Sequence, residues 1–423
     1  MTTRDGAKLA IHGGEPVRTR TWPEWPRADA RTQRSLLDAV HSTKWTISGA
    51  SDRPQSYEQA FGQAFASYIG VAYGVPCASG TAALTIALQA LDIRPGDEVI
   101  VPGLTWVACA SSVCNVGAVP VLVDVDPATL CLAPAAVEAA ITPRTRAVMV
   151  VHLYSSLADL DAVLEIAARH DLHVIEDGSQ AHGAARNGRR IGSFGTIGAF
   201  SLQQSKLLTS GEGGIAVTSD AGLYDRLQQL RADGRRYRRG ASRQWEFREL
   251  EFAGDVFGRN LCMSEFAAAV ALSGLERLDD QNRLRKENFL ALRQQLAAFD
   301  GVRLVDTADA ADQATFYRLC CRFDERVLTT HDAAAIADAL TMELRLPVER
   351  IDAPLNDHPL YRPLLAPQVA AAPAYAARVD PARFALPHAH AAYRTCVGLP
   401  HNALLGDDND VADIVTAIRK VLT

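Results

Sequence analysis

The chain has 423 residues, of which 48% are hydrophobic, and a formal net charge of −6 at pH 7. This length is enough for a large core and two or three domains, and the negative charge gives no basic surface for nucleic acid or an anionic membrane. Residues 1–15 contain no apolar segment of signal-peptide length, and no apolar run reaches the roughly 18 residues that span a membrane, so we expect a soluble, cytoplasmic protein without a nucleic-acid or membrane partner.

Short β-branched runs alternate with helical stretches over residues 51–280. The runs that we predict as buried strands are 73–77, 99–101, 119–124, 147–152 and 173–177, and the predicted helices are 81–91, 106–116, 158–170 and 220–233. Continuously apolar strands separated by helices favour a mostly parallel sheet covered on both faces. The sequence therefore predicts a large α/β domain over 51–280, preceded by an N-terminal arm over 1–50.

The residue pattern changes after the predicted α/β domain. One long helix is predicted from Glu265 to about Phe299, and alanine-rich helices are predicted over 332–340 and 410–422, with several prolines between them. We interpret residues 281–423 as a smaller C-terminal α+β domain.

The cysteine and histidine patterns do not indicate a metal site. The eight cysteines include no Cys-x-x-Cys pair, and the eleven histidines show no His-Glu-x-x-His spacing, which metal sites usually display. Cys320 and Cys321 are adjacent in an apolar stretch, where free cysteine packs as a small hydrophobe. We expect no bound metal.

Lys206 is one of only five lysines among 43 lysine and arginine residues. It lies between an apolar run, 197–202, and a glycine-rich segment, 210–214. A desolvated lysine can lose its proton and attack a carbonyl, which a guanidinium cannot do. On this context alone, a solvated surface lysine is an equally good interpretation.

Polar residues follow several predicted strands, where ligands gather in open α/β sheets. Ser79, Gly80 and Thr81 precede a helix whose N–H groups could hold an anion, although N-capping explains these residues as well. Glu176 and Asp177 end another strand, where a cationic heterocycle or a buried arginine would compensate their charge.

Two further positions complete this pattern. Trp106 opens a helix and could present its face to a flat ring, although core packing is its commoner role. Ser201 precedes Lys206 by five residues, after another apolar run.

Together these residues describe a pocket for a flat, phosphorylated, cationic ring that carries an aldehyde, which is pyridoxal 5′-phosphate (PLP). This cofactor requires a lysine and an acidic partner for its ring nitrogen, and Lys206 and Asp177 would supply them. The carboxylate would keep the ring nitrogen protonated, and Lys206 would move the Cα proton of the substrate amine.

Four motifs in this order resemble the DegT/DnrJ/StrS sugar aminotransferases of PLP fold type I. The motifs are Ser79-Gly80-Thr81-Ala82-Ala83-Leu84, Glu176-Asp177 through Ala181-His182-Gly183, Phe200-Ser201 through Lys206 to Gly211-Glu212-Gly213-Gly214, and Asn260-Leu261-Cys262-Met263-Ser264-Glu265. The lysine segment followed by Gly-Glu-Gly-Gly is the most specific of them. The resemblance spans nearly the whole chain and implies a PLP-dependent aminotransferase with a mostly parallel sheet in the large domain.

The resemblance also implies roles for individual residues. Lys206 would form the Schiff base, Asp177 would pair with the ring nitrogen, Gln180 would bond the phenolic oxygen and Trp106 would stack on the ring. Ser79 belongs to the phosphate-binding segment, in which Gly80, Thr81 and Ser201 would hold the phosphate. Asn260 would reach the phosphate of a neighbouring subunit, which implies a homodimer with shared active sites.

Within the family, the segments 152–160 and 258–265 and the opening 9–14 resemble the branch that acts on keto-cyclitols. This implies transfer of the amino group of L-glutamine to a ketone of the scyllo-inosose or 2-deoxy-scyllo-inosose type, in aminoglycoside antibiotic biosynthesis. The alternative is amination of a nucleotide-linked or pseudosugar ketone with glutamate or glutamine. One departure concerns Ile351 and Asp352, which stand where relatives usually show an aromatic residue.

Two other classes of protein are less well supported. PLP-dependent dehydratases that resemble this family carry histidine at the lysine position, which Lys206 contradicts. PLP-sensing regulators generally carry an added N-terminal DNA-binding module, and this chain reaches its predicted fold by about residue 50 without a basic helix-turn-helix.

Overall fold

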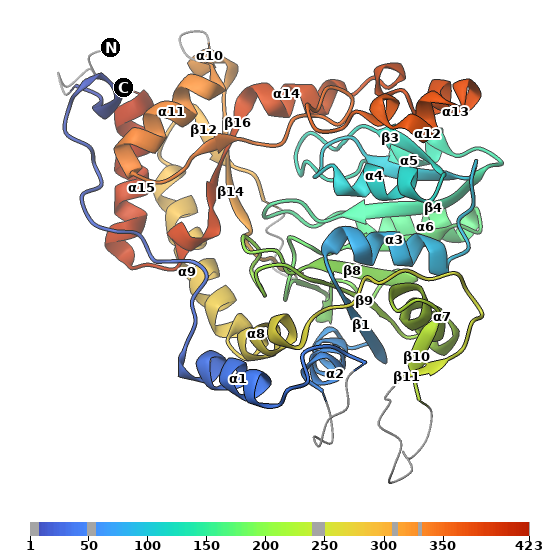
Figure 1. The fold of residues 1–423 in the computed structure, drawn as a ribbon. Helices are drawn as coiled ribbons and strands as arrows, with labels where there is room; N and C mark the ends of the chain where they lie inside the picture. The colour runs from blue at the N-terminus through green and yellow to red at the C-terminus, as the bar shows by residue number, and fades with distance from the viewer. Residues whose placement is uncertain (1–7, 49–55, 239–249, 307–311, 329–331, 423) are drawn as a thin grey trace.

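The computed structural model describes residues 8–48, 56–238, 250–306, 312–328 and 332–422. Its centre is a seven-stranded sheet in the order β1-β9-β8-β5-β4-β2-β3 (Figure 1). The strands in that order are Tyr73–Cys77, Gly214–Thr218, Ile197–Ser201, His173–Asp177, Thr145–Val151, Glu98–Pro102 and Val119–Val123. All neighbouring pairs from β8 to β3 are parallel, and β9 is antiparallel to both of its neighbours. The prediction of a mostly parallel sheet is confirmed.

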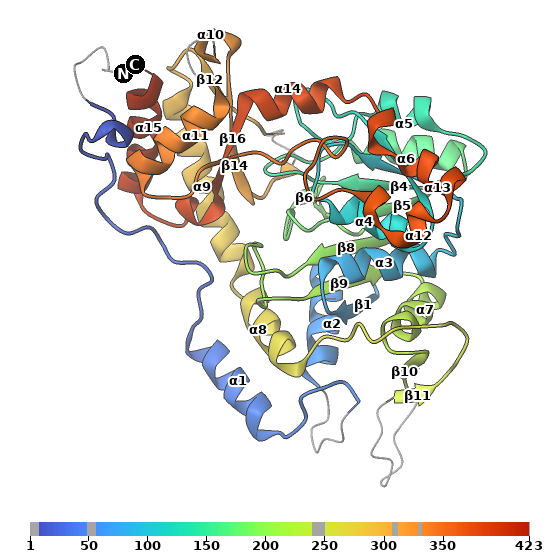
Figure 2. The same cartoon turned by 45° about the horizontal axis from the view of Figure 1, so that its top comes forward.

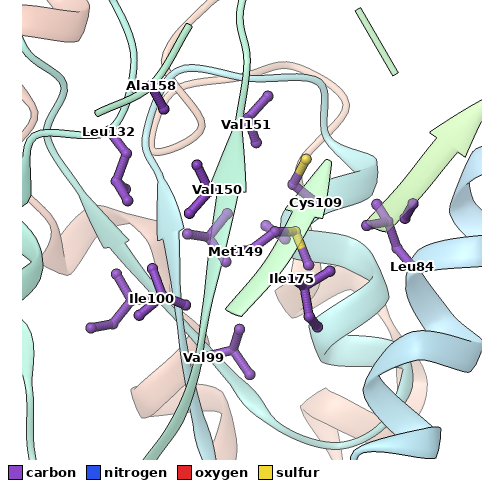
Figure 3. Packing of buried hydrophobic residues seen from close by; sticks show 14 of the residues in the cluster. Leu84, Val99, Ile100, Cys109, Leu132, Met149, Val150, Val151, Ala158 and Ile175 are labelled. Atoms are coloured by element: carbon purple, nitrogen blue, oxygen red, sulfur yellow. The ribbon is translucent and has the colours of Figure 1, made fainter. Parts of the chain in front are cut away.

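Helices pack on this sheet as the alternating sequence pattern predicts. They are α2 (Tyr57–Ile69), α3 (Gly80–Ala90), α4 (Ala108–Asn115), α5 (Pro134–Ala140), α6 (Leu160–Arg169) and α7 (Ala221–Arg231). Helix α3 contacts β8, β9, α4 and α7, whereas α6 contacts β4, β5 and α5. Figure 3 shows Met149 and Ile175 of the sheet packed with Leu84 of α3 and Cys109 of α4. Burial of such continuously apolar strands is what fixes the sheet inside the domain.

A second, antiparallel sheet has the order β12-β14-β16-β15. Its strands are Val302–Leu304, Arg318–Phe323, Cys396–Pro400 and Glu349–Arg350, and the helices beside it are α9 (Leu278–Leu296), α11 (Ala333–Leu344) and α15 (Asp408–Leu422). These elements share a separate hydrophobic core. Cys321 belongs to that core, whereas Cys320 belongs to the core of the large sheet. The two adjacent cysteines therefore pack into different hydrophobic cores.

The long helix predicted from Glu265 to about Phe299 is wrong, because two helices occupy this region. Helix α8 spans Glu265–Leu275, and α9 begins at Leu278. Asp279 and Asp280 lie in the first turn of α9, where negative charge stabilises a helix N-terminus. Between the helices, Arg277 forms an ion pair with Asp29 at 2.7 Å. This contact connects the break between α8 and α9 to the N-terminal segment of the chain.

Residues 351–395 extend back over the large sheet. Figures 1 and 2 show α12 (Pro367–Ala370) and α13 (Pro373–Val379) beside this sheet, where α13 contacts β3. Val369 and Val379 pack on Val119, and Ile351 and Leu386 join the main core. The division into an arm, a large domain and a small domain at residues 50 and 280 stays a prediction.

The remaining elements are short or peripheral. They are η1 (Ala10–His12), α1 (Ala30–His41), β6 (Ala185–Arg186), β7 (Arg189–Arg190), β10 (Arg235–Tyr237), β11 (Leu250–Phe252), β13 (Asp312–Gln313), α10 (Glu325–Leu328), η2 (Pro363–Leu365), η3 (Pro381–Arg383), α14 (Pro387–Thr395) and η4 (His401–Leu404). Within the residues that the structure describes, no helix combines the length and the apolar character needed to cross a bilayer.

Candidate active site

A cavity of about 500 Å³ lies at the carboxyl ends of the parallel strands. Two parts of the chain line it. The N-terminal wall consists of Ser79, Gly80, Thr81, Leu84, Thr105, Trp106, Ala108, Val151, Asp177, Ser179, Gln180, Ser201, Gln203, Ser205, Lys206 and Glu212, and the C-terminal wall consists of Tyr317, Arg318 and Asp352. The structure thus brings together every predicted site residue except Asn260, which lies outside this cavity.

The first turn of α3 forms one end of the N-terminal wall. Ser79 is the N-cap of this helix, and its hydroxyl accepts a hydrogen bond from the Ala82 N–H at 3.1 Å. A Cβ on Gly80 would lie 2.6 Å from Cβ of Ser201, and one on Gly214 would lie 2.2 Å from the Ser79 carbonyl oxygen. Glycine therefore lets three segments meet around a helix N-terminus, whose free N–H groups favour an anion such as phosphate. The capping interpretation of Ser79 is also correct, because the same side chain caps the helix.

The two carboxylates at the end of β5 have different partners. Glu176 accepts hydrogen bonds from the N–H groups of Gly192, at 2.9 Å, and of Phe194 and Gly195, both at 2.6 Å. Asp177 instead lines the cavity. Neither carboxylate pairs with an arginine in the described part of the chain. Glu176 is thus satisfied by a backbone loop, and Asp177 is the carboxylate that can pair with a cationic ring.

Cys109 and Ser179 hold the Asp177 side chain. The Cys109 thiol donates to Oδ2 at 3.1 Å, and the Ser179 N–H donates to Oδ1 at 3.0 Å. Burial, together with the charge of Asp177, raises the pKa of the Cys109 thiol well above its ordinary value. The thiol therefore stays protonated and acts as a donor.

Gln180 is fixed with its amide oxygen turned toward the protein. This oxygen accepts a hydrogen bond from the Tyr154 N–H at 2.7 Å. The amide nitrogen is consequently the atom of Gln180 that remains to donate to a ligand in the cavity. That polarity suits the phenolic oxygen of PLP, which accepts hydrogen bonds.

Lys206 is half-buried in the wall of the cavity and forms no ion pair with a carboxylate among the described residues. Its Nζ lies 4.1 Å from the centroid of the Tyr317 ring, and the Tyr317 hydroxyl lies 3.0 Å from Oγ of Ser205. Burial opposes ionisation of Tyr317, but the charge of Lys206, the contact with Ser205 and the charge of Arg318 together lower its pKa. The amine thus faces the cavity on an aromatic side chain of the C-terminal wall.

Trp106 is half-exposed at the cavity, with 50% of its surface accessible, and its ring meets the His358 ring edge-on at 6.3 Å. The core-packing alternative for Trp106 is therefore wrong. Its proposed stacking on the cofactor stays a prediction.

The residues present fit PLP. The cavity combines an amine, a carboxylate that pairs with no cation in the described part of the chain, an amide donor and a helix N-terminus opened by glycine. When bound, the cofactor would supply an electron sink for the substrate carbanion. Lys206, Asp177 and Gln180 would hold its ring, and the start of α3 with Ser201 would hold its phosphate.

Sequence reasoning missed several residues of the site. Tyr317 and Arg318 come from segments without a ligand motif, Cys109 carries no metal-site spacing, and Tyr154 lies in the segment 152–160 that pointed only to a branch of the family. A second signal is the departure at Ile351 and Asp352. Ile351 is buried in the main core, and Asp352 lines the cavity.

Comparison with known proteins agrees with the family that the motifs resemble. The sequence model of the DegT/DnrJ/EryC1/StrS aminotransferase family matches residues 28–419. The chain is 49% identical to the L-glutamine:scyllo-inosose aminotransferase of Streptomyces griseus, over 98% of each protein. It is 47% identical to the L-glutamine:2-deoxy-scyllo-inosose aminotransferase of Streptoalloteichus tenebrarius, over 98% of this chain and 97% of that protein.

Solved structures agree with this match. The crystal structure of 3-amino-5-hydroxybenzoic acid (AHBA) synthase superimposes with a TM-score of 0.79 at 30% identity, over 96% of this chain and 99% of that chain. S. venezuelae DesV, solved in complex with a ketimine intermediate, gives a TM-score of 0.75 at 30% identity, over 95% of this chain and 99% of that chain. The predicted fold of PLP-dependent transferases is confirmed.

Proposed function

The chain belongs to the DegT/DnrJ/EryC1/StrS aminotransferase family and is a PLP-dependent aminotransferase, and on that basis we propose that it transfers the amino group of L-glutamine to a keto-cyclitol. The proposed acceptor is scyllo-inosose or 2-deoxy-scyllo-inosose, and the proposed setting is cytoplasmic aminoglycoside antibiotic biosynthesis. The observation that carries this proposal is identity of 47–49% over nearly the full length of relatives named for these substrates.

The geometry supports specific roles in this reaction. Lys206 would hold the cofactor and would be the base that moves the proton at the substrate Cα. Asp177, held by Cys109 and Ser179, would keep the ring nitrogen protonated, and the cofactor would supply the electron-withdrawing ring. The same groups serve both half-reactions, because donor and acceptor occupy the cavity in turn.

Separate assays of the two half-reactions test the proposal. We expect the visible absorption band of the PLP enzyme to bleach when L-glutamine is added and to return when scyllo-inosose or 2-deoxy-scyllo-inosose follows. A panel of nucleotide-linked keto sugars and ketoses serves as the comparison set, with L-glutamate as the alternative donor. Lack of bleaching with either donor, or return of the band only with nucleotide-linked sugars, would exclude the proposed reaction.

We also propose a homodimer in which Asn260 reaches the cofactor phosphate of the partner subunit. Asn260 is exposed and lies outside the cavity of its own chain. Large apolar side chains are exposed in the same region of the sequence, with Phe252 at 82% and Phe257 at 95% accessible. Exposed aromatic residues of this kind are typical of interfaces.

Mixing two inactive variants tests this shared site. Lys206→Ala and Asn260→Ala subunits are each expected to be impaired alone. A mixed dimer would contain one site with native Lys206 from one subunit and native Asn260 from the other, so remixing after mild dissociation should restore up to about half of the activity per dimer. Absence of recovery in verified mixed dimers would show that Asn260 acts within its own subunit or not at all.

A further inference from the structure

The C-terminal wall carries a carboxylate for which the transfer chemistry has no use. Asp352 lines the cavity just after β15, two residues beyond Arg350. The other acidic residues of the cavity differ from it, because Asp177 is held behind the ring site by Cys109 and Ser179 and Glu212 is exposed. Asp352 therefore needs its own explanation.

The position of the Asp352 carboxylate is fixed by a buried tyrosine. The Tyr154 hydroxyl donates to Oδ2 at 2.8 Å and accepts from the Asp352 N–H at 3.0 Å. Tyr154 is only 2% exposed, and its own N–H bonds to Gln180. Tyr154 thus links the Asp352 carboxylate to Gln180 of the N-terminal wall.

Tyr154 adopts an unusual backbone conformation to make these contacts. Its φ is 59°, in the left-handed region that bulky residues rarely occupy. Such conformations persist where surrounding contacts over-determine them, and they cluster at functional sites. Here the contacts in question are those to Asp352 and Gln180.

One oxygen of Asp352 remains available to a ligand. Tyr154 uses Oδ2, and within the described residues Oδ1 receives no hydrogen bond. Arg318 also lines the cavity, but it pairs with Glu349 at 2.9 Å and makes no ion pair with Asp352. Two opposite charges therefore face the same cavity without neutralising each other by contact.

We propose that Asp352 selects the acceptor: Oδ1 accepts hydrogen bonds from the ring hydroxyls of an uncharged keto-cyclitol, and the negative charge disfavours ketones that carry phosphate or diphosphate. The inference rests on the proposed function. A carboxylate only accepts hydrogen bonds, which matches a ring bearing hydroxyl donors. A like charge placed against a phosphate is a repulsive element of the kind that sets specificity.

The arrangement of Asp352 and Arg318 is also compatible with L-glutamine, the proposed amino donor. L-Glutamine carries an α-carboxylate, which Asp352 repels, but the guanidinium of Arg318 in the same wall offers a partner for it. Burial opposes protonation of Arg318, but the neighbouring Tyr154 and Asp352 raise its pKa, so it stays charged. Tyr154 is a positioning residue in this scheme, since it acts through Asp352.

The test compares Asp352→Asn with the matched variant Asp357→Asn. Asp357 is an exposed carboxylate of the same loop, outside the cavity. Three quantities are measured: the rate of the L-glutamine half-reaction, the rate of the acceptor half-reaction with scyllo-inosose, and the affinity for scyllo-inositol. Scyllo-inositol is a polyol without a ketone, and its binding is measured by calorimetry. The last measurement does not depend on turnover.

We expect Asp352→Asn to lower kcat/KM for scyllo-inosose about 10- to 100-fold, mainly through KM, because a hydrogen bond to a charged group is lost. Binding of scyllo-inositol should weaken similarly, nucleotide-linked keto sugars should become better substrates relative to the inosose, and the L-glutamine half-reaction should not slow. Asp357→Asn should behave as wild type. If Asp352→Asn fails to fold, Asp352→Glu, which keeps the charge, should still discriminate against diphosphate-linked ketones.

The outcomes separate the inference from the proposed function. If wild-type enzyme aminates an inosose but Asp352→Asn does so equally well and binds scyllo-inositol equally well, the role of Asp352 is wrong and the function stands. If wild-type enzyme prefers nucleotide-linked keto sugars to every inosose, both are wrong.

Discussion

The two walls of the cavity are held in different ways. The N-terminal wall comes from the ends of neighbouring strands of one sheet, and its segments are cross-linked, as in the hydrogen bond from the Ser201 N–H to Oγ of Ser179 at 2.9 Å. The C-terminal wall comes from Tyr317, the start of β14 and the loop after β15. It meets the large-sheet part of the chain through side-chain contacts such as Ser205 with Tyr317 and Tyr154 with Asp352, and through backbone hydrogen bonds from the Tyr317 N–H to the Tyr154 carbonyl oxygen at 3.1 Å and from the Leu355 N–H to the Gly103 carbonyl oxygen at 2.7 Å.

With the proposed roles, this difference would separate the groups that carry the chemistry from those that choose the substrate. Groups that hold and activate the cofactor need a rigid frame, which parallel strands and a helix N-terminus provide. The groups that we propose to meet the substrate lie on segments that belong to the second sheet or follow it. Substitutions in the N-terminal wall should therefore slow both half-reactions. Substitutions in the C-terminal wall should change kcat/KM for one of the two substrates, the amino donor or the keto acceptor, more than for the other.

Lys206→Ala makes the strongest test of the N-terminal wall. Loss of the amine removes both the attachment of the cofactor and the proton-transfer group, so turnover should fall by at least about 1,000-fold in both half-reactions. Stopped-flow absorbance with L-glutamine and, separately, with the inosose measures this. Lys286→Ala, at an exposed position of α9, should leave both rates unchanged. Turnover retained in Lys206→Ala would refute the central assignment.

Gly80→Ala tests the close approach of segments in the same wall. The added Cβ would meet Ser201 Cβ at 2.6 Å, so α3 or β8 must shift, at a cost of about 1–3 kcal/mol. We expect PLP affinity to fall by about 10-fold or more, which fluorescence titration of the apoenzyme measures. Gly222→Ala, near the start of α7 and facing only the tip of Asp220, is the matched glycine. Equal PLP affinity in the two variants would mean that the contact between Gly80 and Ser201 is not critical.

His182→Gln tests the support behind the N-terminal wall and should have the smallest effect. His182 is fully buried near Phe200, and burial, reinforced by the charge of Lys206, lowers its pKa to about 3. Between pH 6.5 and 3 the unfolded chain therefore binds a proton that the folded chain does not, so stability falls as the pH is lowered, by about 1.4 kcal/mol per pH unit from this group.

Urea unfolding at pH 7 and pH 5 measures this contribution. The loss of unfolding free energy between the two pH values should be about 2 kcal/mol smaller in His182→Gln than in wild type. An identical loss in the two proteins would show that His182 does not remain neutral in the folded state.

Much of this site could be predicted because its residues follow local rules. Asp177 ends a strand, Ser79 precedes a helix, and Lys206 stands near glycines, so strand-end and capping patterns were enough to bring them into one hypothesis. The break at Glu276 and Arg277 was missed because both residues keep right-handed helical backbone angles and no proline marks the place, where the structure pairs Arg277 with Asp29.

The sequence alone therefore determined the mostly parallel sheet from its apolar pattern and, through the resemblance of four motifs, the aminotransferase family and its cofactor, whereas the roles of single residues toward that cofactor stay predictions. The tertiary structure shows why Asp177 and not Glu176 is available to the cavity, since Glu176 is satisfied by backbone N–H groups and Asp177 is held by Cys109. It also decided that Tyr154 fixes Asp352 across 198 residues of sequence. Contacts of that separation depend on how the second sheet packs on the first, and no local pattern encodes them.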